Sequence, residues 1–172
     1  GLDVIPSNTE LTKFDVSITE HEGFENILSD KLKDVKGYDF IIIDSPPHLG
    51  MLTVNGFIFC KELIIPLQVE YYALEGLVKL LKTINLVRTR FNKNIDLCGI
   101  LATMYDLRTN LSQQIHGIIK KQWGEKVFKT IIRDNVRLAE APSFGMTIFD
   151  YAPSSYGAED YLSLAKEVIN RG

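Results

Sequence analysis

Residues 38–50, with the sequence YDFIIIDSPPHLG, constrain the fold of this chain more than any other stretch. Residues 40–43 are four consecutive apolar residues, three of them β-branched, and they predict a strand buried on both faces. The turn residues 45–47 end that strand at once, so Asp44 lies at its carboxyl end. In open α/β sheets the ligand crevice lies outside these ends, so the Asp44 carboxylate is placed to meet a ligand or its metal ion.

Strands and helices alternate along the rest of the chain. Apolar runs closed by turn residues indicate the strands, and apolar residues at three- and four-residue spacing indicate the helices. We expect strands over residues 2–5, 40–43, 63–67, 97–102 and 127–132, helices over 24–35, 49–59, 74–91, 110–123 and 158–170, and a polar loop over 7–22. This alternation predicts an α/β fold with a doubly wound, mostly parallel sheet and helices on both faces. Because the 172 residues are 45% hydrophobic and contain no linker-like stretch, we expect a single domain over residues 1–172.

Composition argues against several classes of protein. The net charge of −3 argues against a protein that is basic overall, but it is compatible with a local basic face. Cys60 and Cys98 lie in apolar surroundings without C-x-x-C spacing, which favours buried, reduced thiols over a zinc site. No apolar run reaches the roughly 18 residues of a membrane span, and the first residues lack a signal-peptide pattern. We therefore expect a cytoplasmic protein with no membrane association.

The turn after Asp44 suits a phosphate switch. A carboxylate at a strand end can hold a magnesium-bound water, and a stiff turn of two prolines and a glycine can present backbone N–H groups to a γ-phosphate. The alternative is that Asp44 caps the helix that follows. Spacing alone does not choose between the two.

Four blocks of sequence resemble the ParA/Soj/MinD family of deviant Walker P-loop ATPases, and ParA-type chromosome and plasmid partition proteins most closely. They stand in the family's order along nearly the whole chain: YDFIIIDSPP at 38–47, QVEYYALEGL at 68–77, TMYDLRTN at 103–110 and NVRLAEAPS at 135–143. The resemblance implies a P-loop NTPase-like fold with ATP and Mg²⁺ as cofactors of the full-length protein. It also implies an ATP hydrolase that forms a homodimer on ATP binding, binds DNA without sequence preference, works with a ParB-like partner and associates with the nucleoid.

The resemblance gives roles to residues of the first block. It implies that Asp44 is the Walker B residue near magnesium, which it holds through water. It implies that Pro46, Pro47 and Gly50 belong to the switch that senses the γ-phosphate. His48 stands where many family members have serine, which leaves its role open.

Later blocks supply the remaining residues that the resemblance places near the nucleotide. It implies that Met104, Arg133, Asp134 and Asn135 lie near the adenine. By the same resemblance, the segments 68–72 and 140–142 lie near the nucleotide-dependent dimer contact.

The largest departure from the family is the phosphate-binding loop. The sequence contains no G-x-x-x-x-G-K-[ST] and no Gly-Lys pair. We expect the chain to be the C-terminal part of a ParA-like protein, inactive alone, with Asp44 as a magnesium position without its phosphate. The lost P-loop strand would leave an open sheet edge beside the Asp44 strand, at which other chains can pair. The alternative is a nucleotide-independent protein-interaction module related to ParA.

A basic cluster in the second half bears on DNA binding. Between residues 108 and 137, seven positive residues stand against two acidic ones. The DNA-contact candidates are Lys120, Lys121, Lys126, Lys129 and Arg137. Two observations weigh against them: a solvated helix face has the same composition, and Gly124 and Ser154 stand where the resemblance places arginines.

Other functions are less well supported by the sequence. Residues 166–172 have no extra apolar face for a membrane-binding helix of the MinD kind. Ser143 lacks a nucleophile-elbow pattern, and His21, His48 and His116 do not have metal-ligand spacing.

Overall fold

The computed structural model describes residues 1–17, 22–46 and 48–171. These residues form two compact units, Gly1–Lys61 with Lys82–Ile95, and Glu62–Leu81 with Asp96–Gly172. Each unit is described below by itself, and the expectation of a single domain stays a prediction.

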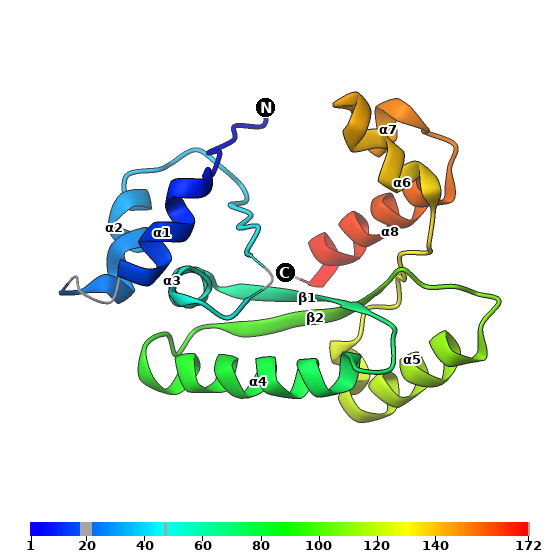
Figure 1. Ribbon diagram of the computed structural model, residues 1–172, viewed down its shortest axis with the longest axis horizontal. Helices are drawn as coiled ribbons and strands as arrows, with labels where there is room; N and C mark the ends of the chain where they lie inside the picture. The colour runs from blue at the N-terminus through cyan, green and yellow to red at the C-terminus, as the bar shows by residue number, and fades with distance from the viewer. Residues whose placement is uncertain (18–21, 47, 172) are drawn as a thin grey trace. The chain divides into compact units, whose positions relative to one another are not determined.

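The second unit is built on a parallel sheet. Strands β1 (Glu62–Gln68) and β2 (Asp96–Thr103) pair in parallel, with Ile65 opposite Ile100. The predicted strands over 63–67 and 97–102 are therefore confirmed. Helices α5 (Asn110–Trp123) and α8 (Tyr156–Arg171) lie on opposite sides of this sheet (Figure 1). The α/β class, with a parallel sheet and helices on both faces, is confirmed.

The predicted strand over 127–132 is only partly formed. Two isolated parallel bridges lie at the ends of the segment: Ile100 of β2 pairs with Val127, and Tyr105, two residues after β2, pairs with Arg133. Between them, the backbone N–H groups of Lys129 and Thr130 donate to the Glu167 carboxylate at 2.8 and 2.9 Å. Because a side chain of α8 takes these donors, the ladder with β2 is interrupted there.

The core of the second unit lies between β2 and α8. Leu101, Phe128 and Ile132 are buried together, and Leu164 and Val168 of α8 pack against them. Gly99 makes room for this cluster, since a Cβ atom at that position would lie 2.5 Å from the Phe128 ring.

The long helices agree with their predicted extents. Helix α4 (Ala73–Arg90) was expected over 74–91, and α5 and α8 over 110–123 and 158–170. The Thr109 side chain accepts the N–H of Ser112 and so caps α5. Of the apolar stripe on α4, residues 77, 84 and 87 are buried, whereas Val78 is exposed. No helix among the described residues is both long and apolar enough to cross a membrane.

Four short helices were not predicted. They are η3 (Gly124–Lys126), α6 (Val136–Glu140), η4 (Ala141–Phe144) and α7 (Ile148–Tyr151). Each has at most five residues, which is too few for the helical period to show in the sequence. Side-chain caps start two of them: Asn135 accepts the N–H of Arg137, and Thr147 accepts the N–H of Asp150.

The described part of the first unit is helical. It contains α1 (Thr9–Ser17), η2 (Phe24–Asn26), α2 (Ile27–Leu32) and α3 (Met51–Phe59). The helix over 49–59 is confirmed, and the one over 24–35 is shorter than expected. The polar loop over 7–22 is wrong at 9–17, where α1 forms. Its missed start signal is Asn8, whose side chain accepts the N–H of Glu10 at 3.0 Å.

The two strands predicted in the first unit are wrong. Residues 2–5 and 40–43 have no strand structure. Their apolar side chains are exposed, Ile42 by 90%, except that of Ile43, which is half-buried. A strand requires a neighbour that pairs with its N–H and C=O groups, and no strand occurs among the described residues of this unit. The apolar run before Asp44 is therefore not paired with a strand among the described residues, rather than buried on both faces.

Glu167 gives a test of how α8 is held. Burial of its carboxylate raises the pKa, but hydrogen bonds from Lys129, Thr130 and Arg171 outweigh burial and lower the pKa from 4.5 to about 2. The stabilisation is therefore complete above pH 4.5 and is lost as the pH falls through about 2.

We predict that Glu167→Gln lowers the free energy of unfolding at pH 7 by about 2 kcal/mol and flattens its dependence on pH below 4.5. Urea titrations at several pH values measure both effects. Lys166→Gln, at an exposed neighbouring position, is the control. An unchanged acid limb in Glu167→Gln would contradict this account.

Candidate functional site

The residues predicted to form the site fall into two groups, one in each unit. Asp44, Pro46 and Gly50 belong to the first unit, and Pro47 lies outside the described residues. Met104, Arg133, Asp134 and Asn135 belong to the second unit.

Asp44 is exposed and does not cap a helix. The N-cap of α3 is Gly50, with no side-chain cap hydrogen bond, so the alternative of Asp44 as a helix cap is wrong. The start of α3 is held instead by Thr53, whose hydroxyl donates to the backbone oxygen of His48 at 2.9 Å.

Helix α3 packs against the segment that carries Asp44. A Cβ atom at Gly56 would lie 3.6 Å from Ser45 Oγ and 3.7 Å from Ile43 Cγ2, which is ordinary van der Waals contact. The absence of a side chain at Gly56 therefore leaves the residues on both sides of Asp44 close to this helix. The position of Asp44 is set by this packing, because no strand pairing holds it.

The residues present do not by themselves fit a magnesium nucleotide. Asp44 provides one exposed carboxylate. Among the described residues, no group of three or more His, Cys, Asp or Glu side chains could hold a metal ion. The sequence also has no P-loop to bind phosphates through backbone N–H groups. Asp44 thus offers one ligand position, and we derive no chemical step from it.

The second group gathers at the carboxyl end of β2. Tyr105 and Arg133 form a parallel β-bridge, and the backbone N–H of Asp134 donates to the backbone oxygen of Tyr105 at 3.1 Å. Met104 directly precedes Tyr105, and Asn135 directly follows Asp134. The structure therefore brings the four residues predicted near the adenine to one edge of the sheet.

Met104 has a strained backbone. Its φ of 49° lies in the left-handed region, and it is the one non-glycine residue with positive φ in the part of the chain that the structure describes. Such a conformation costs an L-residue about 1–2 kcal/mol. Residues in sparsely populated conformations cluster at functional sites. The Met104 side chain is 55% exposed at the carboxyl end of β2, where ligands of α/β sheets bind.

The Arg133 side chain binds residues of α8. Its guanidinium donates to both oxygens of the buried Asp160 and to Glu159, and lies 4.2 Å from the centre of the Tyr156 ring. The hydrogen bonds with Asp160 raise the pKa of Arg133 above its ordinary value. Asn135 is similarly occupied as the cap of α6. Of the four residues, Met104 and Asp134 have exposed side chains.

The segments predicted near a dimer contact differ in exposure. Tyr71 and Tyr72 follow β1, each is 76% exposed, and their rings meet edge to face at 5.1 Å. Glu140, in the other segment, accepts hydrogen bonds from Arg137 at 2.9 Å and from the Tyr151 hydroxyl at 3.0 Å.

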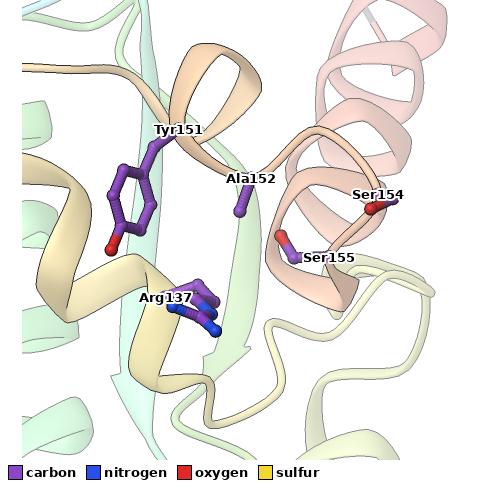
Figure 2. Close-up of a pocket in the computed structure, with 5 residues that line it drawn as sticks. All are labelled: Arg137, Tyr151, Ala152, Ser154 and Ser155. Carbon is purple, nitrogen blue, oxygen red and sulfur yellow. The ribbon is translucent and has the colours of Figure 1, made fainter.

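Arg137 also borders a hollow of about 530 Å³. Figure 2 shows Arg137 and Tyr151 beside it, with Ala152, Ser154 and Ser155 leading into α8. The hydrogen bond to Glu140 raises the pKa of Arg137, so the guanidinium stays charged, but its charge is largely balanced. The hollow is therefore a weaker site for an anion than its arginine suggests.

The other DNA-contact candidates have different surroundings. Lys126 donates to Asp96 at 2.9 Å and to the Leu97 oxygen at 2.7 Å, at the amino ends of the strands. Lys120 and Lys121 are exposed in the last turn of α5, and Lys129 is exposed in the interrupted segment beside β2.

Both cysteines are free and partly buried. Burial raises the pKa of Cys60 to about 11, and burial also raises the pKa of Cys98. Thiols with raised pKa values are poor nucleophiles. Both cysteines are partly buried, rather than fully buried as expected.

Similarity to known proteins runs along the whole chain. A family model described as an AAA domain matches residues 1–97. The sporulation initiation inhibitor protein Soj of Bacillus subtilis is 48% identical over 173 residues, which cover 100% of this chain and 68% of that protein. The chain belongs to the Soj/ParA family. The resemblance that rests on the four sequence blocks is thereby confirmed.

Further relatives agree with this family assignment. The chromosome-partitioning ATPase Soj of Thermus thermophilus is 45% identical, over 99% of this chain and 67% of its own length. This Soj/ParA chain thus spans about two thirds of the length of these relatives. A crystal structure of cobyrinic acid a,c-diamide synthase from Mycobacterium smegmatis, with bound ATP analogue and magnesium, superposes with a TM-score of 0.77 at 30% identity. That match covers 94% of this chain and 59% of the synthase.

Met104 offers a test of backbone strain in this Soj/ParA chain. We predict that Met104→Gly raises the free energy of unfolding by up to about 1 kcal/mol, because glycine adopts positive φ without steric cost. Thr103→Gly, at the neighbouring strand residue, should instead lower it by about 0.5–1 kcal/mol. Chemical denaturation measures both values, and a destabilised Met104→Gly would contradict the strain.

Proposed function

We propose that this chain works as part of a Soj/ParA-type ATPase in chromosome partitioning. The observation that carries the proposal is the identity of 45% and 44%, each over 99% of this chain, to two relatives named chromosome-partitioning ATPase Soj. The gathering of Met104 and Asp134 at the carboxyl end of β2 supports it, since ligands of α/β sheets bind at that edge. The protein would bind ATP, dimerise, contact DNA without sequence preference and respond to a ParB-like partner.

In this proposal the chain's own residues have separate tasks. In the full-length protein, Asp44 would hold a magnesium-bound water, and Pro46, Pro47 and Gly50 would belong to the switch near the γ-phosphate. The Met104 side chain contacts the adenine, while Arg133 and Asn135 hold the surrounding backbone through Asp160 and α6. Bound magnesium would neutralise phosphate charge.

Asp44 provides the direct test of nucleotide chemistry. In the gene product that contains this chain, we predict that Asp44→Asn lowers ATP turnover about 100-fold, since a neutral amide does not replace a carboxylate that holds magnesium. Asp39→Asn, in the same exposed segment, is the matched control. Turnover is measured by phosphate release with and without Mg²⁺.

Two results would count against the ATPase. Equal turnover in Asp44→Asn and the parent would remove the magnesium role. A gene product that binds neither ATP nor ADP in equilibrium dialysis, yet still binds a partner protein, would favour the nucleotide-independent interaction module.

DNA binding is tested at α5. With ATP present, we predict that the double variant Lys120→Glu and Lys121→Glu weakens the binding of duplex DNA. The slope of log K for DNA binding against log salt should become smaller in magnitude by about 2, because roughly 0.9 counterions are released per phosphate contact. The matched control, with the same change of charge, is Lys31→Glu and Lys33→Glu, both exposed in the first unit. Identical slopes for the two double variants would exclude the α5 lysines.

A further inference from the structure

We infer that His116 is a positioning residue for the β2 end, by which we mean residues 104, 105, 133 and 134 at the carboxyl end of β2. The uncharged His116 ring holds Tyr105, and with it the β2 end, in the form that presents Met104 and Asp134. A proton on the ring loosens the β2 end. The inference deepens the proposed function, and only its effect on nucleotide affinity rests on that function.

The ring nitrogen Nε2 of His116 is buried without a partner. Helix α5 buries Ser112, Ile115 and Ile119 along one side, and His116 lies next to that side. Its Nε2 atom is almost inaccessible to water and has no hydrogen-bond partner among the described residues. Buried polar groups are nearly always hydrogen-bonded, so an exception of this kind needs an explanation.

The His116 ring packs against the ring of Tyr105. The two ring centres lie 5.6 Å apart, and the rings meet edge to face at 86°. Tyr105 is 7% exposed, and its backbone joins both sides of the β2 end. The Tyr105 N–H donates to the backbone oxygen of Ile132 at 3.0 Å, and its oxygen accepts the backbone N–H of Asp134 at 3.1 Å. His116 therefore acts on the β2 end through Tyr105.

The strained backbone of Met104 makes the β2 end sensitive to this ring contact. A left-handed residue persists only where the surrounding structure holds it in place. Tyr105 directly follows Met104, and its buried ring and two backbone hydrogen bonds provide such an anchor. A weaker contact between Tyr105 and His116 lets the backbone of Met104 relax, and the side chains of Met104 and Asp134 are then no longer held together.

A proton on His116 would place an unpaired charge against Tyr105. Neutral imidazole carries one N–H, whereas imidazolium carries an N–H on both nitrogens and needs an acceptor for each. Among the described residues, the titratable groups that face the ring are Tyr105, from the segment after β2, and Lys120, from α5 itself. Neither offers a carboxylate to pair with the charge. Burial, and then the charge of Lys120, lower the pKa of His116.

The lowered pKa sets the direction of the pH effect. The contribution of His116 to stability is fully present above its ordinary pKa of 6.5 and is lost as the pH falls through the lowered value. Because a single proton is taken up, the affinity for a nucleotide at the β2 end falls by at most about tenfold per pH unit.

Hydrogen exchange and nucleotide binding test the inference in the gene product that contains this chain. Without nucleotide, we expect the protection of the Tyr105 and Asp134 amides, corrected for intrinsic exchange, to fall from about pH 8 to about pH 5. In His116→Phe, which keeps a ring that cannot be charged, this protection should stay constant. The affinity of the parent for Mg-ATP should fall about tenfold more over this range than that of His116→Phe. The ratio of the two affinities cancels the titration of the nucleotide phosphates.

Lys120 supplies an independent variant. Lys120→Gln removes the positive charge that acts on His116, so the acid loss of protection should move to a higher pH. Lys166→Gln makes the same change of charge at an exposed position of α8 and should leave the loss at the pH of the parent. Thermal unfolding verifies that each variant is folded, and if His116→Phe is not, Lys120→Gln still decides the test.

Three results would overturn the inference. They are protection of Tyr105 and Asp134 that does not depend on pH in the parent, an equal acid loss in the parent and His116→Phe, and an equal shift in Lys120→Gln and Lys166→Gln. A gene product that binds no nucleotide, yet loses protection with acid only when His116 is present, would refute the proposed ATPase and support the role of His116.

Discussion

The carboxylate of Glu167 connects the parts of the second unit. It accepts two backbone N–H groups from the segment beside β2 and is paired with Arg171 one turn later. Arg171 in turn donates to the backbone oxygens of Cys98 and Val127. The last helix thus completes an interrupted strand with side chains. This arrangement fixes residues 131–135 and hence the edge at which Met104 and Asp134 meet.

The same constraint, that each backbone polar group needs a partner, explains which elements the sequence predicts. Apolar runs identify β1 and β2, because each finds a parallel neighbour within the chain. Residues 40–43 have an equally strong pattern, yet they pair with no strand among the described residues, and the first three are exposed. Periodicity reports what a segment could bury, not whether a partner is present. The break in the third strand depends on Glu167, which is 37 residues away from Thr130.

In the candidate site, too, the sequence predicts some features, and others depend on tertiary contacts. The sequence blocks predict which residues gather at the end of β2, and the structure brings Met104, Arg133, Asp134 and Asn135 together there. The tasks of their side chains were not predictable, because the ion pair of Arg133 with Asp160 depends on the docking of α8. The left-handed backbone of Met104 also has no signal in the sequence, since glycine or asparagine is the usual residue there.

The close packing at Gly99 has a consequence for how such sequences can vary. The Phe128 ring lies where a side chain on residue 99 would be, and the Arg171 guanidinium lies 4.1 Å from the centre of that ring. A larger residue at 99 therefore requires a smaller one at 128, and without the ring Arg171 loses the surface on which it stacks. We therefore expect positions 99, 128 and 171, which are far apart in the chain, to vary together.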